Sequence, residues 1–218
     1  MAKIDKNQPL PSHTKLSYDE CYAKFVLEYC CPERYGTLSV LDKPDLQNRS
    51  LDIGVEVTAS VSKNFKAAES IGCKLPCLSK DQFEKNCKKL EDLHVEHHAP
   101  VLIHPPEPVY FGPTIEMVET KFEKLNSGHY QQLSTYDLFV WVNLFLDDAK
   151  TRHELLDKFV SMCDKECNYS FIFIYAIDTL YAFDLCNKQV KCFELKQQNY
   201  DFARKARQMV EDAEADQL

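Results

Sequence analysis

Glycine is scarce in this chain, with only 5 occurrences among 218 residues. A loop that wraps phosphate groups needs several glycines within a short stretch, and the nucleophile turn of α/β-hydrolases needs the pattern G-x-S-x-G. Neither pattern occurs in the sequence. The chain is therefore not expected to bind nucleotides through a P-loop or to use a serine nucleophile on such a turn.

Long apolar runs and an excess of basic residues are missing as well. No apolar stretch is long enough to cross a bilayer, and the first 15 residues are polar, without the apolar segment of a secretory signal. We therefore expect a cytoplasmic protein without a membrane partner. Lysine and arginine total 26 against 34 aspartates and glutamates, a net charge of −8. This balance argues against a protein that coats nucleic acid with its whole surface, although it allows a local basic groove.

Cysteine, in contrast, is plentiful, with 10 residues. Disulfide-rich proteins are usually short and secreted, so a reduced protein with packed thiols is the simpler interpretation. Two pairs have C-x3-C spacing, Cys73 with Cys77 and Cys163 with Cys167. Structural zinc sites usually have tighter spacing, and a zinc or thiol protein is therefore the least favoured alternative.

Hydrophobic periodicity predicts a chain in which helices and strands are mixed. The predicted helices are 18–31, 62–71, 81–90, 114–125, 148–162 and 200–215, and the predicted strands are 37–41, 51–59, 137–146, 169–177, 180–185 and 190–195. This order favours a three-layer α/β domain with a central mixed β-sheet flanked by helices. A flexible arm is expected over residues 1–15 and a single domain over residues 16–218, with a Pro/His-rich insertion near residues 91–113.

The stretch of residues 43–60 has the most informative pattern. Its apolar residues occupy alternate positions: Leu51, Ile53, Val55 and Val57. Since successive side chains of a strand point to opposite faces, one face enters a core and the other presents Asp52, Glu56 and Thr58. Charged side chains are rarely buried without a partner or a metal ion. This acid-bearing strand is therefore a candidate functional element.

A polar turn over residues 47–50 allows a hairpin that brings Asp45 back beside Glu56. Two carboxylates that share such a position can hold a hard divalent cation such as Mg²⁺, which orients a phosphate and activates a water molecule. The alternative interpretation is that Asp45 is only a turn residue and that Glu56 is exposed to solvent.

These residues resemble the core motif of the PD-(D/E)xK nucleases, the restriction-endonuclease-like superfamily. Pro44-Asp45 corresponds to the PD of the motif, and Glu56-Val57-Thr58 corresponds to (D/E)xK, with Thr58 in the position of the lysine. The resemblance implies a restriction-endonuclease-like core and hydrolysis of DNA phosphodiester bonds that depends on Mg²⁺ or Mn²⁺. It also implies that Asp45 and Glu56 are catalytic metal ligands, and it is compatible with a homodimer.

Thr58 can hydrogen-bond a water molecule but carries no charge, so either another lysine replaces the missing one or the site is inactive. In the resembled family a helix packs beside the catalytic strand and can direct a lysine to the site. That makes Lys121 the first candidate and Lys124 the second. An acid from the first helix often joins the metal ligands, and either Glu20 or Glu28 could do so here, with Glu20 taken as the candidate. The alternative for each of these side chains is an ordinary solvated position on a helix.

Two functions are therefore carried forward from the sequence. The first is a metal-dependent endonuclease-like protein with DNA as its partner. The second is a catalytically inactive relative that serves as a binding or assembly module, which Thr58 and the acidic net charge favour.

Overall fold

The computed structural model describes residues 10–11, 13–60, 67–68, 71–72, 74–75, 78–93, 95–98, 101–103, 111–128, 130–142, 146, 148–163 and 166–215. Its contacts divide the chain into two compact units. Residues 14–60 and 111–218 form the larger unit, and residues 1–13 and 61–110 belong to the smaller one.

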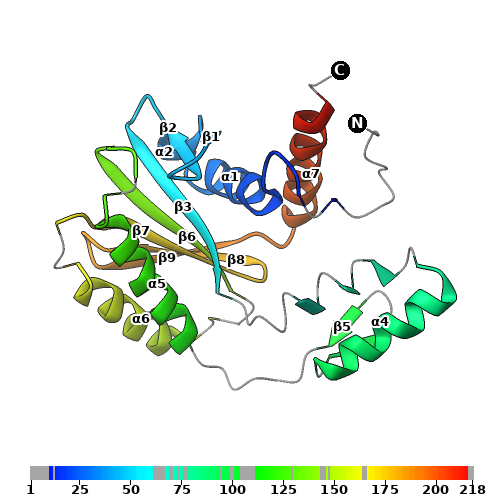
Figure 1. Ribbon diagram of the computed structural model, residues 1–218. Helices are drawn as coiled ribbons and strands as arrows, with labels where there is room; N and C mark the ends of the chain where they lie inside the picture. The colour runs from blue at the N-terminus through cyan, green and yellow to red at the C-terminus, as the bar shows by residue number, and fades with distance from the viewer. Residues whose placement is uncertain are drawn as a thin grey trace. The chain divides into compact units, whose positions relative to one another are not determined.

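The larger unit is built on a mixed sheet of seven strands (Figure 1). In sheet order the strands are β1 (Ser39–Val40), β2 (Leu46–Asn48), β3 (Ile53–Ser60), β6 (Thr135–Val142), β7 (Tyr169–Ala176), β8 (Thr179–Asp184) and β9 (Gln189–Glu194). The two central pairings, β3 with β6 and β6 with β7, are parallel, and the other four are antiparallel. Parallel neighbours require a crossover connection, and helices supply it here.

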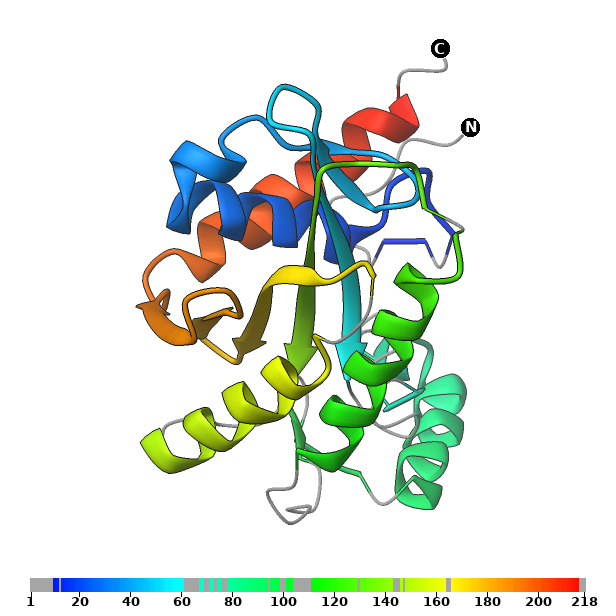
Figure 2. The same cartoon turned by 90° about the vertical axis from the view of Figure 1, so that its left-hand side faces the viewer.

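Helices cover both faces of this sheet. Helices α1 (Tyr18–Cys30) and α7 (Asn199–Ala215) lie on one face, and α5 (Gly112–Leu125) and α6 (Ala149–Ser161) lie on the other (Figures 1 and 2). A one-turn helix, α2 (Pro32–Tyr35), follows α1. The α/β class and the central mixed sheet flanked by helices are thus confirmed.

In β6, the two faces of the sheet pack against their helices through different residue types, aliphatic on one face and aromatic on the other. Against α5 and α6, β6 contributes the buried aliphatic residues Leu138, Val140 and Val142. Against α1 and α7, Tyr22 of α1 makes edge-on ring contacts with Trp141 and Tyr175 at centroid distances of 5.0 and 5.8 Å. Aromatic pairs of this geometry add roughly 0.5–1.5 kcal/mol each beyond the area they bury. The alternation of β6 therefore directs aliphatic residues to one layer and aromatic residues to the other.

The smaller unit contains α4 (Lys80–Asp92) and a two-stranded antiparallel sheet of β4 (Glu96–His98) and β5 (Val101–Ile103). Its buried apolar residues are Ala68, Leu75, Leu90 and Val95. The hairpin falls within the Pro/His-rich segment predicted near residues 91–113. Most of the helix predicted over residues 62–71 lies outside the described residues, as do residues 143–145 of the predicted strand extension.

Two local predictions are corrected. Asp52 was predicted to share the polar face of the strand with Glu56, but it lies in the turn before β3 with a φ of 54°. Its carboxylate accepts hydrogen bonds from the Ser134 amide and hydroxyl. Helix α5 begins at Gly112 rather than at the predicted residue 114, because Pro113 fits the first turn of a helix, where its missing N–H leaves no bond unmade.

Candidate functional site

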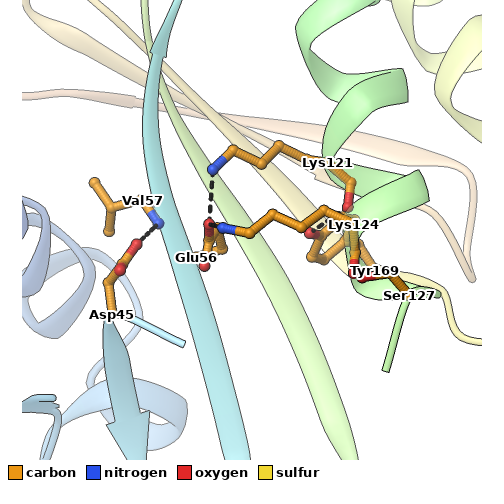
Figure 3. Close-up of polar contacts among 7 residues, drawn as sticks. All are labelled: Asp45, Glu56, Val57, Lys121, Lys124, Ser127 and Tyr169. Carbon is orange, nitrogen blue, oxygen red and sulfur yellow. Dashed lines mark hydrogen bonds and ion pairs between the residues drawn. The ribbon is translucent and has the colours of Figure 1, made fainter. Parts of the chain in front are cut away.

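The candidate site lies where β2 diverges from β3. The two strands pair only from Leu46 opposite Val55 to Asn48 opposite Ile53, which leaves residues 56–60 of β3 without a β2 partner. Asp45 immediately precedes β2, so the hairpin register carries it to the level of Glu56, although the turn lies at residues 49–52 rather than at the predicted residues 47–50. The Asp45 carboxylate accepts a hydrogen bond from the Val57 amide at 2.7 Å (Figure 3). The Asp45 side chain thus provides the hydrogen-bond acceptor for β3 just beyond the last residue that pairs with β2.

The Pro44 ring packs directly on the backbone of β3 at Gly54, near the point where β2 and β3 begin to diverge. A Cβ atom added at Gly54 would lie 2.2 Å from Cγ of Pro44 and 2.7 Å from Cδ1 of Leu133. Real Cβ atoms do not approach carbon that closely, so only glycine lets the Pro44 ring rest on β3. The residues of the Pro-Asp pair are therefore positioned by a glycine of the neighbouring strand.

Glu56 is buried and is held by two lysines of α5. Its side chain is 4% exposed, and its Oε1 atom accepts hydrogen bonds from Lys121 Nζ at 2.6 Å and from Lys124 Nζ at 3.0 Å (Figure 3). Residues three apart on a helix lie on one face, so both lysines reach the same carboxylate. The Lys121 side chain is 17% exposed, whereas that of Lys124 is 46% exposed. The structure brings both candidate lysines to the predicted catalytic acid.

The acids at this site differ in how well they are compensated. Burial raises the pKa of Glu56, but the hydrogen bonds from Lys121 and Lys124 outweigh burial and leave its pKa below the ordinary value. Burial, and then the nearby Glu56 charge, raise the pKa of Asp45 to about 6 despite the opposing Val57 amide. Burial, and then the charges of Asp45 and other acids including Glu56, raise the pKa of Glu20 to about 7. Both lysines donate directly to Glu56 and act on Asp45 only through space.

This donor set fits a hard divalent cation by its chemistry. Carboxylate oxygens are the ligands that Mg²⁺ and Mn²⁺ prefer, and an added cation would lower the pKa values of Asp45 and Glu20, which burial and then neighbouring acids raise. Within the described part of the chain, no three histidine, cysteine, aspartate or glutamate side chains already surround a common metal position. A cation at this site would be held by Asp45 and Glu56, with Glu20 as the third acid coupled to both.

The remaining predicted residue, Thr58, lies two positions beyond Glu56 on β3. It is half-buried and pairs with Val140 of β6. Strand alternation places it on the same face as Glu56. The threonine thus occupies the position of the motif lysine, while the lysines that contact Glu56 come from α5.

Two further polar residues could not be assigned from the sequence. The Tyr130 ring lies 5.3 Å from Lys124 Nζ. The Tyr130 hydroxyl is buried and close enough to Glu56 to lower the pKa of that acid, but it makes no hydrogen bond of ordinary geometry to the described residues.

Asp137 of β6 is fully buried and accepts hydrogen bonds from Tyr35 at 2.7 Å and from Arg34 at 2.9 Å. Its register opposite Val55 places it on the other face of the sheet from Glu56. Asp137 therefore anchors α2 and is not part of the site.

The cysteine alternative has little support in the described residues. Cys163 is half-buried, and its thiol donates a hydrogen bond to the Phe159 carbonyl oxygen at 3.5 Å, whereas Cys167 is exposed. Cys73 and Cys77 lie outside the described residues. None of the described helices has the length and apolar composition that a bilayer crossing requires.

No family model, curated protein or solved structure matches this chain. Its function therefore has to be inferred from the geometry of the site itself.

Proposed function

We propose that this chain is a metal-dependent endonuclease that hydrolyses phosphodiester bonds in DNA. The observation that carries this proposal is the contact of 2.6 Å between Lys121 Nζ and Glu56 Oε1, beside the Asp45 carboxylate at the divergence of β2 and β3. Lys121 of α5 thereby supplies the ammonium group that Thr58, at the position of the motif lysine, does not provide. Acids and an ammonium group gathered at one strand edge are the parts that phosphodiester hydrolysis requires.

The order of elements supports a restriction-endonuclease-like core. Helix α1 precedes the antiparallel strands β1, β2 and β3, and α5 then leads to β6, which is parallel to β3. This arrangement agrees with the helix beside the catalytic strand that the motif implies. It places both lysines of α5 over the strand that carries Glu56.

In the proposed reaction, Asp45 and Glu56 hold Mg²⁺ or Mn²⁺, and Glu20 adds a third carboxylate. When bound, such a metal stabilises the charge that develops on the phosphate and lowers the pKa of a water molecule. The ammonium group of Lys121 orients the attacking water or the phosphate. Thr58 is limited to hydrogen bonding a water molecule. The short distance and low exposure of Lys121 make it the better fixed of the two lysines.

The same proposal covers the partner and the location. DNA is the substrate, despite the net charge of −8, because the lysines of α5 supply positive charge where the phosphate would lie. A homodimer and a cytoplasmic location stay predictions from the sequence and the resemblance.

The second candidate function is an inactive relative that binds or assembles without cutting. Two lysines already neutralise Glu56, and the motif lysine is replaced by Thr58, which together favour this alternative. In such a module the cluster would stabilise the junction of β3 and α5 and would bind no metal ion. Calorimetric titration with Mn²⁺ separates the two functions, because only the nuclease needs a metal that binds through Glu56.

The direct test is nicking of a supercoiled plasmid in the presence of Mg²⁺ or Mn²⁺. The wild-type protein should convert the plasmid to the open circle. Both Glu56→Gln and Asp45→Asn should reduce the rate about 100-fold or more, the scale of losing a group that stabilises transition-state charge. Glu119→Gln is the matched control, since Glu119 is exposed on α5, and it should cleave at the wild-type rate. Equal cleavage by Glu56→Gln and the wild type would contradict the proposal.

A further inference from the structure

Two cations contact one oxygen of Glu56, although a single ammonium group is enough to neutralise a buried carboxylate. Lys121 and Lys124 donate to the same Oε1 atom, at 2.6 and 3.0 Å. The Asp45 carboxylate, in contrast, accepts its hydrogen bond from the Val57 amide at 2.7 Å. Among the described contacts, both lysines therefore donate to one acid of the cluster.

The two lysines are not equivalent. Lys121 is 17% exposed and makes the shorter contact, whereas Lys124 is 46% exposed and makes the longer one. A half-exposed ammonium group regains hydration readily when it leaves a partner, so breaking the Lys124 contact with Glu56 requires less free energy than breaking the Lys121 contact.

Lys124 has a second partner in Tyr130. The Tyr130 ring lies 5.3 Å from the same Lys124 Nζ that contacts Glu56, within the range of a cation–π contact. The ammonium group would therefore keep this partner if its contact with Glu56 were broken. A lysine held there would be free to contact a phosphate oxygen.

We infer that Lys124 is a displaceable counter-ion that shares Glu56 Oε1 with Lys121 until a divalent cation binds to this carboxylate. This inference rests on the proposed function, since it takes Glu56 to be a metal ligand. Lys121 stays with Glu56 throughout, and Lys124 keeps only its contact with the Tyr130 ring. The device keeps the buried carboxylate neutralised in the metal-free protein and sets the affinity of the site for metal.

The test is calorimetric titration of Mn²⁺ into the full chain and its variants. Lys124→Gln should bind Mn²⁺ about tenfold more tightly than the wild type, a factor equivalent to one modest ionic contact. Its cleavage rate should fall all the same, because the phosphate contact is lost. Lys158→Gln removes an exposed lysine of α6 and should leave the Mn²⁺ affinity unchanged.

Lys121→Gln separates displacement from a general electrostatic effect. It removes the same charge from the same carboxylate, so an unspecific field effect would raise the Mn²⁺ affinity equally in both variants. Displacement of Lys124 predicts a clearly larger gain in Lys124→Gln. Equal gains in the two variants, or no Mn²⁺ binding by Lys124→Gln, would overturn the inference.

The proposed function has its own readout, which is plasmid cleavage by the wild type. If the wild type cleaves the plasmid with Mn²⁺ but Lys121→Gln and Lys124→Gln gain equally in Mn²⁺ affinity, the displaceable lysine is rejected and the nuclease proposal is retained. Tighter Mn²⁺ binding by Lys124→Gln with no cleavage by any variant would reject the nuclease and support the displaceable lysine.

Discussion

At the scale of single residues, the site is defined by an uneven distribution of charge. Glu56 has two ammonium partners, but Asp45 has only the Val57 amide as a direct donor among the described contacts. Burial and the charges of Asp45 and other acids raise the pKa of Glu20 to about 7, well above its value in an unfolded chain. A folded protein that binds a proton more tightly than the unfolded chain loses stability as the pH rises between the two pKa values.

Glu20→Gln should therefore stabilise the metal-free protein in a pH-dependent way. The pKa of an unfolded glutamate is about 4.5 and that of folded Glu20 is about 7, so the destabilising charge develops across this window. We expect a gain of about 1 kcal/mol at pH 8, after allowing for solvent screening of a half-buried group, and almost none near pH 4.5. Urea unfolding in EDTA at both pH values measures this. Glu119→Gln, at an exposed position of α5, is the control, and a gain of equal size at both pH values would contradict the charge explanation.

At the scale of secondary-structure elements, alternation and amphipathic stripes predicted most of the framework. The apolar positions of residues 51–57 predicted β3, and the spacing of the apolar stripe predicted α5. Strand β2 was missed, because its residues 47 and 48 are polar and were assigned to the turn, which lies at residues 49–52. Asp52 was misplaced because a residue with positive φ is not recognisable from alternation. The anchoring of Asp137 was not predictable, since its partner Arg34 is 103 residues away and nothing local marks the pair.

The lysine that contacts Glu56 comes from α5 and not from β3, the strand on which the resemblance to the nuclease motif expects it. Thr58 occupies the motif position on β3, and Lys121 reaches the acid from α5. In the plasmid assay, Lys121→Met should reduce cleavage about 100-fold. Adding Thr58→Lys to that variant should restore at least about tenfold of the lost rate, because the new ammonium group lies on the same face of β3 as Glu56. Thr58→Met in the same background is the control and should restore nothing. A double variant as inactive as Lys121→Met alone would show that the two positions are not interchangeable.

At the scale of the whole molecule, the site belongs to a single compact unit. Asp45, Glu56 and both lysines fall within residues 14–60 and 111–218, and so does Glu20. The unit is interrupted between Ser60 and Phe111, yet its two sides meet, since the Ser60 and Thr114 hydroxyls are hydrogen-bonded at 3.0 Å. A short linker could therefore join Ser60 to Phe111 without straining the larger unit.

Replacing residues 61–110 by a flexible linker of about six glycines and serines should leave the larger unit folded. A linker of that length easily spans neighbouring chain ends, and shortening a loop changes its closure entropy by only about 0.6 kcal/mol per twofold change in length. We expect a cooperative urea transition within about 2 kcal/mol of the full chain, followed by the fluorescence of Trp141, the only tryptophan. Mn²⁺ titration of the shortened chain then asks whether the acids and lysines of the larger unit are sufficient for the site. A shortened chain that unfolds without a cooperative transition would mean that residues 61–110 are required for the larger unit to fold.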